Sequence, residues 1–121
     1  MKDKYVEKII ELWSKLCQKP DDYTKAKVKI NNLAIDELIP LIEELTKDHD
    51  LSEKVFEELL ENNDPFIRQN AASHCLSLNL HIEKSVKTLK GFLKHGKPWE
   101  AMGAERSLKI WRGEIGPNDP G

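Results

Sequence analysis

Apolar residues recur every three or four positions along almost the whole chain, and this spacing constrains the fold more than any other feature. The pattern begins with Val6, Ile9, Trp13 and Leu16. One face of an amphipathic α-helix produces such a stripe. No segment shows the apolar–polar alternation of a half-buried strand between turn residues. The sequence therefore predicts an all-α fold.

Prolines, glycines and short polar turns divide this pattern into about six helices. Asp64 and Pro65 are expected to begin the fourth helix, with the carboxylate as cap and the proline at the first helical position. Gly96 is expected to end the fifth helix and Pro98 to begin the sixth. These residue types stand where helix ends need them, so the boundaries follow from local chemistry.

Two further expectations concern the second and third helices. Pro40 removes a backbone donor and predicts a kink or a break in the second helix. Ser52 is expected to cap the third helix through its hydroxyl. In the fifth helix, the expected apolar stripe consists of Ile82, Val86, Leu89 and Leu93. The residues expected to share one core near the carboxyl end are Leu76, Leu89, Leu108 and Trp111.

The chain has 121 residues, of which 39% are apolar and 33% charged. This length suits one compact domain, which we place at residues 1–115, followed by a flexible tail at 116–121. No stretch approaches the roughly 20 apolar residues of a membrane span, and no export signal is evident. Cys17 and Cys75 are too few for a disulfide framework. A cytoplasmic protein with reduced thiols, and with no membrane partner, is expected.

The stretch 52–79 has the order helix, Asp-Pro turn, helix. Its pattern of Leu59-Leu60, Asp64-Pro65, Ile67-Arg68, Ala71-Ala72 and Leu76 resembles a HEAT repeat. With the closing segment 104–113, the chain resembles a family of small bacterial HEAT-like proteins of unknown function. The resemblance implies a short α-α superhelix, a right-handed solenoid, and it implies no reaction.

Charge is unevenly distributed although the net charge is only -2. Residues 21–64 contain five lysines and thirteen acids, whereas residues 65–121 contain nine lysines or arginines and five acids. Opposed local fields of this kind can steer a charged partner. No convergent catalytic set, cofactor motif or metal-ligand spacing is present, so we expect a protein that is not an enzyme and uses no cofactor or metal.

The acidic segment favours a protein-binding module, since solenoids present extended surfaces. The specific expectation is a bacterial immunity protein that inhibits a cognate toxin, for example a nuclease, through its acidic surface. The expected partner-binding residues are Asp36, Glu37, Glu43, Glu44, Glu57, Glu58, Glu61 and Asp64.

The alternative is nucleic-acid binding by a basic face of the carboxyl-terminal helices, which ranks second because the acidic segment opposes it. The expected anion-binding residues are Arg68, Lys84, Lys87, Lys90, Lys94, Arg106 and Arg112.

Overall fold

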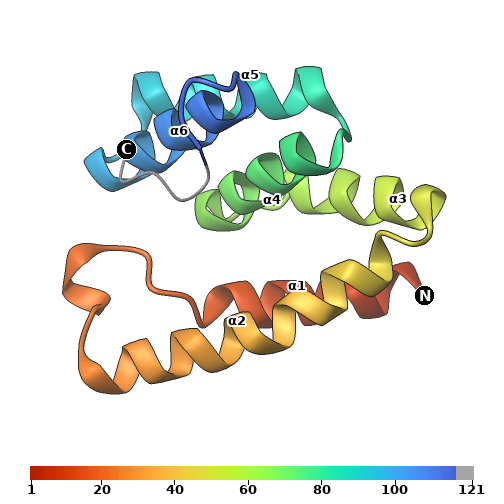
Figure 1. The fold of residues 1–121 in the computed structure, drawn as a ribbon, viewed down its shortest axis with the longest axis horizontal. Helices are drawn as coiled ribbons and strands as arrows, with labels where there is room; N and C mark the ends of the chain where they lie inside the picture. The colour runs from red at the N-terminus through yellow and green to blue at the C-terminus, as the bar shows by residue number, and fades with distance from the viewer. Residues whose placement is uncertain (117–121) are drawn as a thin grey trace. The chain divides into compact units, whose positions relative to one another are not determined.

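The computed structural model describes residues 1–116, which form six α-helices, one short 3₁₀ helix and no strand (Figure 1). The predicted all-α fold is therefore confirmed for this part of the chain. The elements are α1 (Lys2–Ser14), η1 (Pro20–Asp22), α2 (Lys25–Leu45), α3 (His49–Leu60), α4 (Pro65–Leu78), α5 (Ile82–His95) and α6 (Pro98–Trp111).

By their internal contacts the residues form two compact units: an N-terminal unit, residues 1–61, and a C-terminal unit from Asn62 onward. A HEAT-like solenoid and a single domain over 1–115 stay predictions. Most of the predicted flexible tail, residues 117–121, lies outside the described residues. No helix within residues 1–116 combines the length and the apolar character needed to cross a membrane.

In the N-terminal unit, α1 contacts both α2 and α3 and supplies the largest buried side chain. Trp13 is fully buried, together with Ile9 and Leu12 from the same helix. Leu45 at the end of α2 and Phe56 in α3 are fully buried as well. Three residues of the stripe predicted for the first helix, Val6, Ile9 and Trp13, therefore face the core, whereas Leu16 lies beyond the end of α1 and is only partly buried.

Side-chain hydrogen bonds organise the connection from α1 to α2. The Cys17 N–H donates to Asn31 Oδ1 at 2.7 Å, which ties the connection to α2. One carboxylate oxygen of Asp22 accepts from the N–H groups of Gln18 and Lys19. These backbone donors, with the Lys27 ammonium, hold the pKa of Asp22 below its usual value.

Two expectations for α2 and α3 need correction. α2 runs unbroken through Pro40, so of the predicted kink or break the break does not occur. α3 begins at His49, and its cap is Asp48, whose Oδ1 accepts from the Leu51 N–H at 3.1 Å. The hydroxyl of Ser52 is buried and instead donates to the Leu45 carbonyl at 2.8 Å, so it joins the end of α2 to α3.

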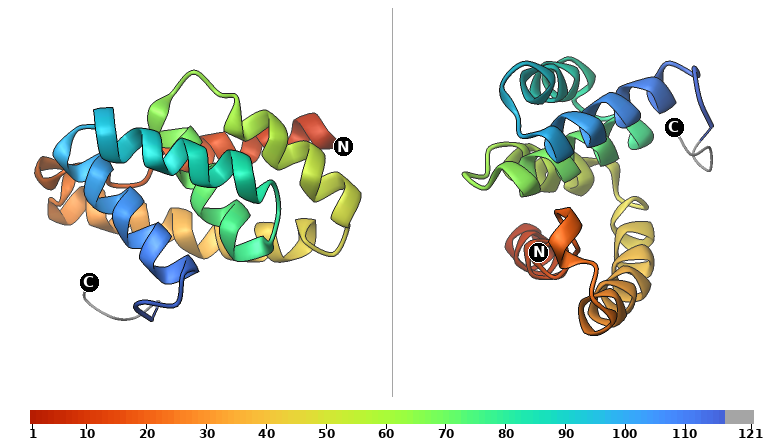
Figure 2. Two further views of the ribbon diagram at one scale, coloured as in Figure 1. Left: turned by 90° about the horizontal axis from the view of Figure 1, so that it is seen from above. Right: turned by 90° about the vertical axis from the view of Figure 1, so that its left-hand side faces the viewer.

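The C-terminal unit consists of α4, α5 and α6, each in contact with the other two (Figure 2). Ala71, Ala72 and Ala104 are fully buried, as expected for small residues between closely packed helices. Close approach of α4 and α6 also depends on a glycine. A Cβ at Gly103 would lie 2.6 Å from Nε2 of Gln69, which donates to a backbone carbonyl of α6 at 2.8 Å.

The core of the C-terminal unit differs from the predicted one at three places. Leu89 and Leu108 are buried, but Trp111 is 42% exposed, because it is the last residue of α6 and lies at the rim of the helix contact. Leu93 is also 42% exposed. Burial on α5 is shifted toward Phe92, which the predicted stripe omits; the buried residues of this helix are Ser85, Leu89 and Phe92.

Burial shifts the pKa of two titratable groups of α4, the fully buried Cys75 and the partly buried His74. Burial raises the pKa of the Cys75 thiol to about 11, although the neighbouring Ser85 hydroxyl opposes the shift. Burial also lowers the pKa of His74 below 6.5. Neither group is therefore charged in the folded protein near neutral pH.

We expect acid to destabilise the fold through His74. Above pH 6.5 the imidazole is neutral in both the folded and the unfolded chain, so it adds no pH dependence. As the pH falls below 6.5, the unfolded chain takes up the proton first, and the free energy of unfolding decreases until the pH reaches the lowered folded-state pKa. Urea titrations at several pH values between 7 and 5 would measure this loss. His74→Gln should flatten the dependence, and an unchanged slope in that variant would contradict the assignment.

Candidate functional site

The acidic residues expected to bind a partner lie on several elements. Asp36, Glu37, Glu43 and Glu44 belong to α2, Glu57 and Glu58 to α3, Glu61 is the C-cap of α3, and Asp64 is the N-cap of α4. All eight are exposed. Asp64 belongs to the C-terminal unit and the other seven residues belong to the N-terminal unit, so we treat them as separate groups.

Part of this acidic charge is used within the protein. Glu37 pairs with Lys8 at 2.9 Å, and Glu58 pairs with Lys2 at 3.4 Å. Asp64 Oδ1 accepts from a backbone N–H in the first turn of α4 at 2.9 Å. Exposed pairs of this kind contribute little to stability, but they reduce the negative potential that a partner would meet.

The remaining acids of α2 lie beside an exposed apolar residue. Ile39 is 53% exposed, and Asp36 and Glu43 stand three residues before it and four after it, on the same helix face. We call these three residues the α2 ridge. Elsewhere on α2, Ile30 and Leu33 are 49% and 60% exposed. The helix thus presents large aliphatic side chains to solvent while it buries others.

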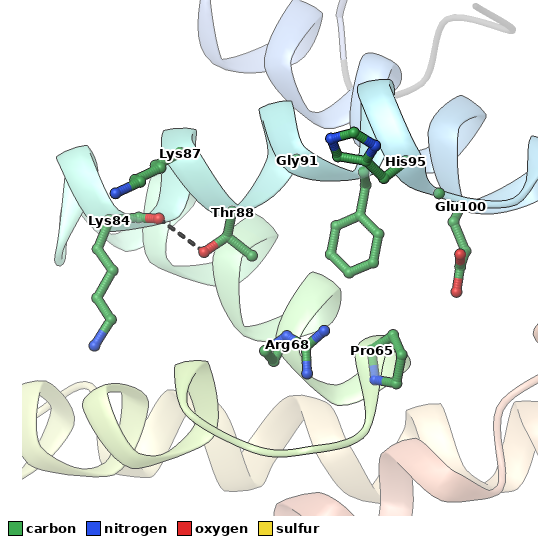
Figure 3. Close-up of a pocket in the computed structure, with 10 residues that line it drawn as sticks. Pro65, Arg68, Lys84, Lys87, Thr88, Gly91, His95 and Glu100 are labelled. Carbon is green, nitrogen blue, oxygen red and sulfur yellow. Dashed lines mark hydrogen bonds between the residues drawn. The ribbon is translucent and has the colours of Figure 1, made fainter.

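A groove of about 590 Å³ lies in the C-terminal unit between α4, α5 and the start of α6. Figure 3 shows Lys84 and Lys87 at one end of this groove and His95 and Glu100 at the other. Its volume falls in the usual range for small-ligand sites. The groove is lined by Pro65, Arg68, Lys84, Lys87, Thr88, Gly91, Phe92, His95, Gly96 and Glu100.

Basic groups dominate the electrostatics of the groove. Nη1 of Arg68 donates to the carbonyls of Asn62 and Asn63 at 2.9 and 3.0 Å, which fixes the guanidinium in place. The one acidic lining residue, Glu100, is engaged by the start of α6, because its Oε1 accepts from the Lys97 N–H at 2.8 Å. The helix N-terminus compensates part of that negative charge.

The groove gathers three of the seven predicted anion-binding residues: Arg68, Lys84 and Lys87. The exposed Lys90 and Lys94 lie on α5 outside its lining. Arg106 is a partly buried residue of α6, and Arg112 pairs with Glu114 at 3.7 Å. The basic face predicted from sequence is thus concentrated on α4 and α5.

Sequence reasoning missed seven of the ten residues that line the groove as site residues. His95 and Gly91 are two of them. The sequence did point to Gly91, because a glycine inside an exposed helix is less favourable than an alanine. A glycine there therefore indicates a functional or packing requirement at that position. In the structure, a Cβ at this position would meet no atom within 4 Å, so the glycine leaves open space over the groove.

One cluster has donor types suited to a metal ion. His49, Asp50 and Glu53 in the first turns of α3 bring ligand atoms within 4.8 Å of one another, and all three side chains are exposed. Nδ1 of His49 lies 3.7 Å from a carboxylate oxygen of Glu53. An exposed group of this kind is explained by ordinary helix spacing, and we assign it no ligand.

Comparisons of the chain with protein-family models, with curated proteins and with solved structures gave no match. The assignment of function therefore depends on the chemistry of the surfaces described above.

Proposed function

We propose that the protein is a non-enzymatic binding module that docks a basic protein partner on the α2 ridge. The observation that carries this proposal is the exposure of Ile39 between two acidic residues. A surface helix normally turns its large aliphatic residues inward, whereas Ile39 is 53% exposed. A contact with an apolar centre and a charged rim is the usual composition of a protein–protein interface.

Charge supports a basic partner. The N-terminal unit contains ten lysines and fifteen acidic residues. Its net negative field would accelerate encounter with a positively charged surface. A toxin that binds nucleic acid presents such a surface, and an immunity protein would cover it with carboxylates in place of phosphates. In its more specific form, the proposal is that the basic partner is a cognate toxin and that this protein inhibits it.

The test compares partner capture by wild-type protein and by ridge variants from the native cell lysate. Asp36→Lys/Glu43→Lys and, separately, Ile39→Ala should lose a basic protein that the wild type retains. We expect a loss of about tenfold in affinity for Ile39→Ala, as for a central interface residue. The charge reversals should mainly slow association, and their effect should shrink as salt rises.

Glu7→Lys is the matched control, because Glu7 is an exposed acid of the same unit on α1. It should retain the partner. Equal capture by wild type, control and both ridge variants would reject the α2 ridge. If the captured protein is a nuclease, inhibition of its activity by the wild type, and weaker inhibition by Ile39→Ala, would establish the immunity reading. An uninhibited nuclease would refute it.

A further inference from the structure

Three exposed lysines follow one another along α5: Lys87, Lys90 and Lys94. Lys87, Lys90 and Lys94 form no ion pair with any residue in the range 1–116. In contrast, Lys109 on α6 pairs with Glu105 at 3.1 Å. Like charges three and four residues apart weaken a helix. This row of lysines is therefore unfavourable for folding. That cost favours a role in binding another molecule.

The row begins in the groove and continues beyond it. Lys87 lines the groove from α5, and Arg68 lines the same groove from α4 (Figure 3). Since Nη1 of Arg68 is held by two loop carbonyls, its Nε and Nη2 donors are positioned in advance for another acceptor. From Lys84 to Lys94 the helix axis rises about 15 Å. A single phosphate or carboxylate is too small to contact cations over that length.

The groove offers apolar surface next to these cations. The exposed Pro65 contributes to its lining, together with the 8% of Phe92 that is exposed, and Gly91 keeps the helix surface open. Grooves that bind single-stranded nucleic acid combine a basic track for the backbone with rings on which bases stack. An acidic protein segment would use the cations but would have no need of a ring surface beside them.

We propose that the groove and the lysine row of α5 form a binding site for single-stranded nucleic acid. The phosphates follow Lys87, Lys90 and Lys94, Arg68 donates to a phosphate oxygen inside the groove, and a base lies against the exposed Pro65, beside the small part of Phe92 that is exposed. The site lies within the C-terminal unit. It is independent of the α2 ridge and of the partner proposed for it.

The experiment measures fluorescence anisotropy of a labelled oligothymidylate of about 12 nucleotides, within the usual range of single-strand site sizes. Binding by the full-length protein should weaken with salt, with a slope of about -0.7 per phosphate contact. Lys87→Gln/Lys90→Gln should reduce the magnitude of that slope by about 1.4 and the affinity roughly tenfold near physiological salt. The same variant should melt at or above the wild-type temperature, because like-charge repulsion is removed.

Three single variants sharpen the test. Lys109→Gln removes a paired lysine of the same unit and should change affinity by less than about twofold. Gly91→Ala should retain binding, since a methyl group meets nothing there. Gly91→Glu should abolish binding, because it places a carboxylate over the groove, although it replaces a glycine with a better helix former.

Several results would overturn the proposal. They are a dissociation constant weaker than about 10⁻⁴ M at low salt, equal losses in Lys109→Gln and the lysine pair variant, and full binding by Gly91→Glu. Tighter binding to a duplex of the same sequence would overturn the single-strand assignment. Equally effective competition by polyglutamate would point to an acidic protein instead. Ile39→Ala should bind the oligonucleotide normally, so failure of this site and failure of the α2 ridge are distinguishable.

Discussion

Replacement of Trp13 by alanine is expected to lower the free energy of unfolding of the N-terminal unit by about 3–5 kcal/mol. Trp13 is fully buried and is the largest such side chain in the described part of the protein. Its removal exposes apolar surface and leaves a cavity that its neighbours can fill only in part. Small domains have about 5–15 kcal/mol of stability in total, so this variant should lose a large part of its stability.

The measurement is urea unfolding followed by far-ultraviolet circular dichroism, since the substitution removes a tryptophan that fluorescence would use. Trp111→Ala is the matched control, because Trp111 is 42% exposed. It should cost about 1–2 kcal/mol, since part of the ring stays in water. Equal destabilisation by the two substitutions would contradict the burial assigned to Trp13. Two separate transitions would show that the units unfold independently, in which case the loss is read from the first unit alone.

The fold was predictable from sequence where local chemistry and periodicity agree. Asp64 and Pro65 begin α4 as expected, and Gly96 caps α5. At these positions a side-chain acceptor, a fixed φ angle and a small residue each satisfy a helix end without help from distant residues. Spacing alone also predicted that Val6, Ile9 and Trp13 of α1 are buried.

The sequence pattern was insufficient where the outcome depends on a neighbouring element. Trp111 lies on the stripe of α6, but periodicity gives only a direction and does not say whether another helix extends far enough to cover the ring. Ser52 and Asp48 were both chemically able to cap α3. The start of α3 decides between them: Asp48 precedes the helix and accepts from the Leu51 N–H, whereas Ser52 lies inside the helix and donates to the Leu45 carbonyl.

The candidate sites show the same limit. Residue counts located the acidic and basic segments, but charge alone does not reveal pairing. The structure shows that Glu37 and Glu58 neutralise lysines of α1. It also shows that Arg68 and Lys87, nineteen positions apart in sequence, line one groove. That proximity arises from the packing of α4 against α5, which no local spacing encodes.

Replacement of Leu108 by alanine is expected to lower the free energy of unfolding of the C-terminal unit by about 2–5 kcal/mol. Leu108 is 1% exposed and belongs to the buried stripe of α6 with Ala104. Ala104, like Ala71 and Ala72 on α4, has no longer side chain to move into the space. Because α4 and α6 also approach closely at Gly103, the helices cannot easily collapse further, which favours the upper part of the range.

Met102→Ala is the matched control on the same helix, because Met102 is 71% exposed. It should change stability by no more than about 0.5 kcal/mol. In a Trp13→Phe background the remaining tryptophans, Trp99 and Trp111, both belong to the C-terminal unit. Their fluorescence during urea unfolding then reports on this unit alone. If Leu108→Ala and Met102→Ala unfold at the same urea concentration, Leu108 does not occupy the core position that the structure assigns to it.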